Sequence, residues 1–380
     1  MQNNAQGPRA PLSNALTAEG EDYPTDEPRL HYLVEKAHAA GTTLEVLPGL
    51  HWLRMPLPID LNHINLWLLE DGDGFTLIDT GMPASPCTEV WEQLESTLLA
   101  QRPLRRILLT HYHPDHMGCA GWLQARHDIP VRMASRAIPW AEFMVDGPST
   151  ERRAASVDFF RAHGMAQARE FFDALPLARN ASPVNRMPII DEPLSDGEHV
   201  AVGAHLFEVI ETDGHATGHQ SFFDAAGGVL ISGDQILPTI SPNISLSASD
   251  WGLDPLGDFL ASLDRLESLP ADTVVLPSHG RPFRGLRARA ADLREHHHEH
   301  LDRLQAAIAV PKTAFDLMSV LFGRRLFGFH QMLGLQECIA HLEHLVQRGR
   351  ARREIRDDGV QRYVGVCRQA PTVSAGTFTA

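Results

Sequence analysis

The chain has 380 residues, of which 43% are hydrophobic and 21% are charged, and its formal net charge at pH 7 is −15. This composition is typical of a folded globular protein. The negative charge argues against a surface built to bind phosphates, and the longest apolar runs, such as residues 64–69, are too short to cross a membrane.

The first 28 residues are rich in Asn, Gly, Pro and acidic side chains, which is typical of a flexible arm. They lack the charged-then-apolar pattern of a secretory signal. The cysteines, Cys87, Cys119, Cys338 and Cys367, are scattered and suggest no disulfide framework. We therefore expect a cytoplasmic protein that does not use a membrane.

Beyond the arm, the spacing of apolar residues predicts a helix over residues 29–40. Short strands follow, and a helix over about 88–99 interrupts them. Residues 137–177 carry helical patterns between strands, which predicts an insertion or lid. A further helix is expected at 259–266. The strands expected around these helices are 43–47, 51–55, 64–69, 75–78, 105–109, 131–134, 198–202, 205–211, 221–224, 229–232 and 273–276.

The composition changes after about Arg284, where helical patterns replace the strands. Three helices and a hairpin are expected there, over 287–308, 314–321, 333–346, and 350–355 paired with 361–366. They predict a winged-helix-like domain over 286–368. A main domain over 29–285 precedes it, and a flexible tail over 369–380 follows it.

The clearest motif is an H-x-H-x-D-H run formed by His111, His113, Asp115 and His116. It lies between an apolar strand and the start of a helix, so its side chains can converge on a small volume. Nitrogen and oxygen ligands without neighbouring cysteines indicate a catalytic divalent metal, with zinc expected first.

Further candidate ligands follow other strands and sit beside small residues. These are Asp79, His215, Asp234 and His279. Strand ends in a layered α/β fold gather at one rim, so we expect these side chains to join the H-x-H-x-D-H run there.

The order and spacing of these motifs resemble the metallo-β-lactamase superfamily over about residues 44–283. The resemblance implies a four-layer αβ/βα sandwich with a di-metal site at one edge. Asp79 matches the family's aspartate that steadies the site by hydrogen bonding. The implied ligands are His111, His113 and His215 for the first metal, Asp115, His116 and His279 for the second, and Asp234 as a bridge.

This resemblance implies a hydrolase in which a hydroxide that bridges two divalent metals attacks a carbonyl or phosphoryl centre. Zinc is the expected metal, and iron and manganese are the alternatives. Asp115 is expected to help handle the proton. Candidate hydrogen-bond partners of the ligating imidazoles are Asp79, Thr217 and His219, although His219 fits a polar turn residue equally well.

Three other stretches are also candidate sites. In the run 295–300, His296 and His300 have the i, i+4 spacing of a helical metal site, but the charged helical pattern favours a solvated face. Residues 62–65 and 238–243 are expected either to border the active site or to be ordinary loops.

Residues 337–345, followed by Gly349-Arg350, resemble the winged-helix extension of the β-lactamase-like protein 2 group, which includes an endoribonuclease. Two functions therefore compete. The first is hydrolysis of a thioester, lactone or ester of a small molecule, with the C-terminal domain packing or forming a homodimer. The alternative is a metal-dependent endoribonuclease or phosphodiesterase whose winged helix binds nucleic acid. A metal-binding scaffold with a regulatory winged helix is disfavoured by the intact ligand set.

Charge and the helical insertion favour the small-molecule substrate and argue against a nucleic-acid partner. The acidic Asp357 and Asp358 at the hairpin turn would also repel phosphates. Basic surface for the alternative is offered by Arg324, Arg325, Arg348, Arg350, Arg352 and Arg353. The sequence lacks a clear counterpart of the basic glutathione-binding cluster of glyoxalase II enzymes, and no tyrosine follows Asp234 as in quorum-quenching lactonases.

Overall fold

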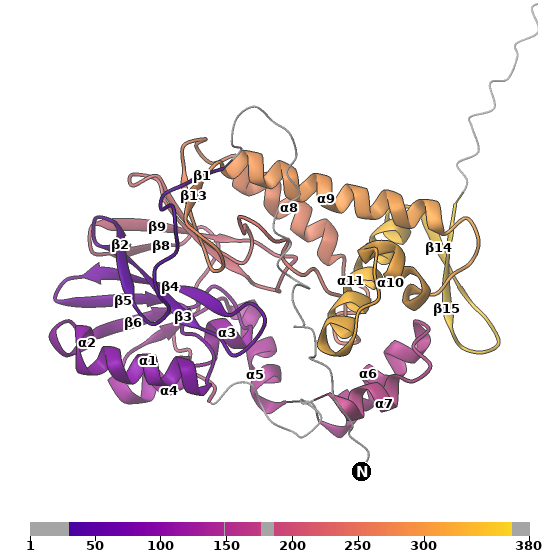
Figure 1. The fold of residues 1–380 in the computed structure, drawn as a ribbon, viewed down its shortest axis with the longest axis horizontal. Helices are drawn as coiled ribbons and strands as arrows, with labels where there is room; N and C mark the ends of the chain where they lie inside the picture. The colour runs from indigo at the N-terminus through magenta and orange to yellow at the C-terminus, as the bar shows by residue number, and fades with distance from the viewer. Residues whose placement is uncertain (1–29, 148, 176–185, 367–380) are drawn as a thin grey trace, which may run out of the picture.

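The computed structural model describes residues 30–147, 149–175 and 186–366 (Figure 1). The predicted N-terminal arm (1–28), the predicted tail (369–380) and part of the predicted insertion lie outside these ranges. Two large sheets form the centre of the molecule, and the orange and yellow C-terminal helices lie at one end of them in Figure 1.

The first large sheet is six-stranded, and its strands run from β2 to β7 in spatial order. β2 to β5 pair antiparallel, whereas β5, β6 and β7 are parallel. The central strands β4 and β5 are buried along most of their length, which explains their continuous apolar sequence. The bounds are β2 (Thr43–Leu47), β3 (Leu50–Pro56), β4 (His63–Asp71), β5 (Gly74–Ile78), β6 (Leu104–Leu108) and β7 (Val131–Arg132).

The second large sheet is seven-stranded, in the order β1-β13-β12-β11-β10-β9-β8. Only β11 and β12 pair in parallel within it. The bounds are β1 (His31–Tyr32), β8 (His199–Val202), β9 (His205–Glu211), β10 (Gln220–Asp224), β11 (Val229–Gly233), β12 (Val274–Pro277) and β13 (Phe283–Arg284). A separate hairpin is formed by β14 (Ala351–Ile355) and β15 (Gln361–Gly365).

Helices cover the sheets and build the C-terminal part of the chain (Figure 1). None of those in the described ranges combines the length and apolar character needed to cross a bilayer. Their bounds are α1 (Ser85–Ser96), α2 (Leu98–Gln101), α3 (Pro114–Met117), α4 (Ala120–His127), α5 (Ile138–Asp146), α6 (Thr150–Ala162), α7 (Ala168–Ala174), α8 (Pro255–Glu267), α9 (Leu286–Ala307), α10 (Ala314–Phe322) and α11 (Gly328–Gln347).

Three apolar clusters define four layers. The middle cluster joins Trp67 of the first sheet to Phe222 of the second. A second cluster packs α1 and α4 on the outer face of the first sheet, and it includes Trp91 of α1. The third packs α8 and α9 on the outer face of the second sheet, and it includes Phe259 of α8. The predicted αβ/βα sandwich is therefore confirmed.

The helix predicted over residues 29–40 is wrong. Residues His31 and Tyr32 instead form β1, which pairs with β13 at the edge of the second sheet. The guanidinium of Arg281 lies 3.7 Å from the centroid of the Tyr32 ring, and Leu33 N–H donates to the carbonyl of Pro282 at 3.0 Å. Strand pairing and these side-chain contacts outweigh the local helical pattern.

The insertion and the C-terminal helices share one apolar cluster. Val157 and Phe160 of α6 belong to the same cluster as residues of α10 and α11. The N–H of Phe315 also donates to the carbonyl of His163 at 3.1 Å. α6 is thus anchored on the C-terminal helices, whereas α5 packs in the cluster of the first sheet through Ala141. The role of the insertion as a lid stays a prediction. The helices and hairpin expected after Arg284 are present as α9, α10, α11 and β14–β15, whereas the winged-helix assignment also stays a prediction.

The face of α9 that was predicted to be solvated is buried instead. His297 and His300 are only 0% and 5% exposed. The reason is that α11 packs against this face and brings His341 within hydrogen-bond distance of His297. His298, on the opposite side of the helix, is exposed as expected.

Candidate metal centre

The predicted site residues follow strands that end at the same rim of the sandwich. β5 and β6 are parallel neighbours in the first sheet, and β11 and β12 are parallel neighbours in the second. β9 runs in the same direction as β11, because both are antiparallel to β10. The residues that follow these strands are Asp79 after β5, His111 to His116 after β6, His215 after β9, Asp234 after β11 and His279 after β12.

The turn between β6 and α3 places the H-x-H-x-D-H run. Pro114 begins α3, a position where its missing N–H has no intrahelical partner to lose. The N–H groups of His116 and Met117 both donate to the carbonyl of His113 at 3.0 Å, which closes a tight first turn. Asp115 and His116 on this turn therefore lie beside the histidines that leave the strand.

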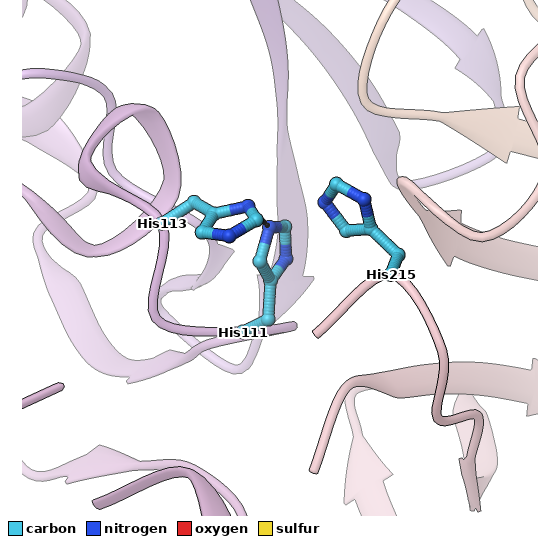
Figure 2. Close-up of side chains that lie close together, drawn as sticks. All are labelled: His111, His113 and His215. Atoms are coloured by element: carbon cyan, nitrogen blue, oxygen red, sulfur yellow. Dashed lines mark hydrogen bonds between the residues drawn. The ribbon is translucent and has the colours of Figure 1, made fainter. Parts of the chain in front are cut away.

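The first predicted ligand group is His111, His113 and His215, whose potential ligand atoms all lie within 4.8 Å of one another. Figure 2 shows the three rings turned toward one another from two separate segments of the chain. His111 Nε2 and His113 Nδ1 are 3.0 Å apart. Tetrahedral zinc with bonds of about 2.0–2.1 Å places neighbouring ligands about 3.3 Å apart, so this spacing suits a shared cation.

The second predicted ligand group is Asp115, His116 and His279, also within 4.8 Å. His279 Nε2 lies 3.5 Å from Asp115 Oδ2. Asp234 lies between the two groups: its Oδ2 is 3.5 Å from the Nε2 atoms of His116 and His215, and its Oδ1 is 3.5 Å from His279 Nε2. The structure thus brings all the predicted ligands together, with Asp234 between the two groups.

Hydrogen bonds at the Nδ1 atoms orient most of these rings. His111 Nδ1 lies 3.0 Å from Thr110 Oγ1, and His215 Nδ1 lies 2.9 Å from the carbonyl of Asn243. His279 Nδ1 lies 2.9 Å from the carbonyl of His63. A carbonyl only accepts, so Nδ1 carries the proton in His215 and His279, which leaves Nε2 free to bind a metal.

Asp79 has the contacts expected of a residue that steadies the site. Its Oδ2 lies 2.8 Å from His116 Nδ1 and accepts from Thr110 Oγ1 at 2.8 Å, and its Oδ1 accepts from Thr110 N–H at 2.8 Å. Its φ is 58°, a left-handed conformation that Asp tolerates better than most residues. Asp79 therefore orients one ligand directly and a second, His111, through Thr110.

His219 is completely buried beside the metal ligands but does not join either ligand group. Its Nε2 accepts the N–H of Asp234 at 3.1 Å, and its Nδ1 lies 2.8 Å from Thr212 Oγ1. A Cβ at Gly233, where φ is 55°, would come within 2.4 Å of His219 Nε2. Glycine at 233 thus permits the contact through which His219 positions the backbone of Asp234.

Burial and close charges shift the pKa values of the site in opposite directions. Burial raises the pKa of Asp234, but the neighbouring imidazoles, His116 first, outweigh burial and hold this pKa well below its ordinary value. Burial lowers the pKa of His116, but the neighbouring carboxylates, Asp234 first, outweigh it and raise this pKa well above its ordinary value. Burial lowers the pKa of His111 well below its ordinary range, which keeps its lone pair available.

Several buried donor atoms of the site lack a hydrogen-bond partner. His116 Nε2, His215 Nε2, His279 Nε2 and Asp234 Oδ1 are buried and have no hydrogen-bond partner. Unpaired buried polar atoms are costly, and their convergence is a typical feature of a metal site. Imidazole nitrogens and carboxylate oxygens in this number fit divalent transition metals.

Sequence reasoning assigned no role to Thr110, and it expected residues 62–65 and 238–243, which contain His63 and Asn243, either to border the active site or to be ordinary loops. The structure places all three residues against metal-ligand candidates. Thr110 could have been found as the hydroxyl residue directly before the first histidine. His63 and Asn243 contact the ligand imidazoles through backbone carbonyls, and such contacts leave no signal in the sequence. Thr217, proposed as an orienting partner, is not seen in that role in the described residues.

Residues 62–65 support the His279 loop. The Asn65 side chain donates to the carbonyls of Pro277 and Gly280, both at 2.8 Å. His63 Nε2 accepts the N–H of Gly280 at 3.3 Å. These contacts fix the chain on both sides of His279, and this segment is thus part of the site's frame.

Sequence profiles and relatives agree with this geometry. The profile described as metallo-beta-lactamase superfamily matches residues 59–279, and the one described as metallo-beta-lactamase-like, C-terminal domain matches residues 301–366. Among solved structures, a beta-lactamase domain protein from Burkholderia ambifaria is 38% identical with a TM-score of 0.80, over 89% of this chain and 98% of that one.

Among curated proteins, the chain is 26% identical over 306 residues to a probable metallo-hydrolase of Bacillus subtilis, which covers 77% of this chain and 91% of the relative. It is also 26% identical over 244 residues to a hydroxyacylglutathione hydrolase of Halorhodospira halophila, which covers 64% and 71%. The chain therefore belongs to the metallo-beta-lactamase superfamily and is one of its metal-dependent hydrolases.

Proposed function

We propose that this hydrolase binds two divalent cations, zinc in the first instance, and cleaves a thioester or related ester bond of a small molecule. The position of Asp234 carries the two-metal part of the proposal. Its two oxygens lie 3.5 Å from imidazoles of both ligand groups, Oδ2 facing His215 and Oδ1 facing His279. A carboxylate in this position can hold two cations a few ångström apart.

In this proposal the cations supply Lewis acidity, which lowers the pKa of a water molecule and polarises a substrate carbonyl. The residues of the chain hold and orient them. Asp79 and Thr110 fix the rings of His116 and His111. The Asp115 side chain is 14% exposed, against 10% for Asp234 and 2% for Asp79, so it is the carboxylate best placed to exchange a proton with solvent.

The preference for a thioester rests on relatives. Several curated relatives are named hydroxyacylglutathione hydrolases, at 24–29% identity. Hydrolysis of such a thioester needs an activated water and a polarised carbonyl, which the candidate metal centre is equipped to supply. The basic glutathione-binding cluster of glyoxalase II enzymes has no clear counterpart in the sequence, so a thioester with another carrier group is expected to be the better substrate.

The paired state of the C-terminal arginines weakens the nuclease alternative. Each of four arginines named earlier as basic surface lies within 4.0 Å of an acidic side chain. The pairs are Arg348 with Asp254, Arg350 with Asp302, Arg352 with Glu354 and Arg353 with Glu343. Their charges are largely offset within the protein, and a net charge of −15 further opposes binding to a phosphate backbone.

The test is a hydrolysis panel on zinc-loaded protein, with His116→Ala as the inactive control. The panel contains acyl thioesters of glutathione and of coenzyme A, lactones, aryl esters, a cephalosporin, phosphodiesters and RNA. We expect the thioesters to give the highest kcat/KM. The proposal fails if none of the ester-type substrates is cleaved by protein whose metal centre holds two cations.

The nuclease alternative gives a different result in the same panel. RNA cleavage that disappears in His116→Ala and weakens steeply with added salt would support it, because phosphate contacts release counterions. Metal analysis of the same samples identifies the cation, since iron and manganese accept the same nitrogen and oxygen donors.

A further inference from the structure

A second group of buried histidines lies between α9 and α11, apart from the predicted metal ligands. It contains His296, His297 and His300 of α9 and Glu337 and His341 of α11. All except His296 are at most 8% exposed. So much burial of imidazole and carboxylate groups is unusual without a partner that satisfies them.

The side chains of this helical histidine cluster converge as metal ligands do. The potential ligand atoms of His300, Glu337 and His341 lie within 4.8 Å of one another, and so do those of His296, His297 and His300. The spacing within each helix explains the convergence: His296 and His300, like Glu337 and His341, are four residues apart and therefore on one helical face.

The cluster offers lone pairs that a cation could take. His341 Nδ1 lies 2.8 Å from the carbonyl of Glu337, so it carries the proton and Nε2 keeps its lone pair. That lone pair faces His297 Nδ1 at 3.0 Å, a hydrogen bond that a bound cation would replace. His300 Nδ1 is buried and has no hydrogen-bond partner. Glu337 accepts one hydrogen bond, from the Asn243 side chain at 2.8 Å.

Burial keeps these imidazoles neutral at physiological pH. It lowers the pKa of His341 and of His296 to about 4, and the pKa of His300 to about 2. Burial has the opposite effect on Glu337 and raises its pKa to about 7. A bound cation would favour both the neutral imidazoles and an ionised Glu337, because it coordinates imidazole lone pairs and balances the negative charge of a carboxylate.

The cluster also shares two features with the candidate metal centre. His297 Nδ1 and His341 Nε2 are 3.0 Å apart, the same separation as His111 Nε2 and His113 Nδ1. Both regions also contain a buried imidazole nitrogen without a partner. We propose that His300, Glu337 and His341 bind an additional divalent transition metal, with zinc as the expected ion and His296 and His297 beside it.

This additional cation would act as a cross-link between α9 and α11. Each helix contributes ligands, so the bound ion would hold the two helices together in the way that structural zinc does in small domains. The cluster is also connected to the metal centre through one residue. The Asn243 side chain donates to Glu337, and its carbonyl lies 2.9 Å from His215 Nδ1.

The test measures bound metal per chain by mass spectrometry on full-length protein that has been loaded with zinc and desalted. The variant His300→Ala/His341→Ala is expected to hold one equivalent less than the wild type. His298→Ala is the matched control, since it removes an exposed histidine from the same helix, and it should equal the wild type. Equal zinc content in the folded double variant and the wild type would overturn the proposal.

Two further variants keep the test decisive if the double variant does not fold. His300→Gln preserves the size and polarity of the side chain, and it should weaken one class of zinc sites at least about 10-fold in competition with a chromophoric chelator. An unchanged affinity would speak against the site. His111→Ala/His116→Ala disables the metal centre and should still retain one tightly bound zinc in its folded state; zinc-free folded protein would contradict the proposal.

Discussion

The metal centre and the helical histidine cluster both consist of histidine and acidic side chains, but different backbone elements bring these side chains together. The centre collects its residues from loops that follow strands of two sheets. The cluster collects them from one face each of α9 and α11. The tight turn after β6 brings the side chains of His111 to His116 close together within one short segment. In the helical cluster, the side chains of α9 and α11 come together only after the two helices pack against each other.

This difference decides what can be known from sequence. The arrangement of side chains in a motif at a strand end depends mostly on the turn that follows the strand, and this turn is formed by neighbouring residues in the sequence. A helical site needs a partner face from elsewhere in the chain, and Glu337 and His341 are more than thirty residues away from His300. Variants in each region show whether both bind metal with the same chemistry.

The largest expected effect is that of His116→Ala on catalysis. His116 Nε2 lies 3.5 Å from the bridging candidate Asp234, and its loss removes a ligand from the second group. Hydrolysis should fall to the uncatalysed background and the metal centre should lose zinc, while the zinc of the helical cluster remains. Steady-state rates and metal content measured on one preparation check both parts. A variant that keeps most of the wild-type rate would contradict the site.

A pH effect of about 3 kcal/mol is expected from Glu337 in protein stripped of metal by a chelator. Burial raises its pKa from 4.5 to about 7, so the folded state loses stability as pH rises through about 7. Glu337→Gln cannot ionise and should not show this loss. Urea unfolding at pH 5 and pH 8 compares the two proteins, whose other groups titrate alike. If the free energy of unfolding changes with pH in the same way in both proteins, the buried site does not raise the pKa of Glu337.

A smaller effect is expected for Asp79→Asn. Asn tolerates the left-handed backbone at this position, but it removes the negative charge and one of the two acceptor oxygens that Thr110 and His116 contact. Zinc affinity of the metal centre should fall about 10- to 100-fold, with no change at the helical cluster. Chelator competition resolves the two classes of site. If the zinc affinities of the metal centre and of the helical cluster fell equally, the two regions would be more strongly coupled than the contacts of Asn243 suggest.

The smallest effect belongs to His298→Ala. This side chain is exposed on the same helix as the cluster, so its removal should change the free energy of unfolding by no more than about 0.5 kcal/mol. Zinc content and hydrolysis should match those of the wild type. A measurable loss of zinc would place the additional ion on the outer face of α9 instead.

The sequence predicted most of the sandwich because its strands are short apolar runs with clear turn residues. It also predicted which side chains meet in the metal centre. The helix expected over 29–40 was wrong because pairing of His31 and Tyr32 with β13 depends on a strand about 250 residues later. Local periodicity contains no information about such a partner.

The site's outer contacts were harder to predict for a related reason. Asp79 was identified through its place after a strand, whereas Asn243 acts through a backbone carbonyl that any residue type provides. His297 and His300 are buried because α11 packs over them. Neighbouring charged residues such as Glu295 and Glu299 made the sequence pattern typical of an exposed helix face. Helical periodicity located the face correctly but could not show what covers it.

α11 also holds the loop that follows Asp234 through several hydrogen bonds along its length. Glu337 accepts a hydrogen bond from Asn243, and His344 lies 2.9 Å from Asp254, which caps α8. The loop and the C-terminal helices must therefore be replaced together when segments are exchanged between relatives. A chimera that takes residues 286–366 from a relative should keep its activity only if residues 235–254 are transplanted with them.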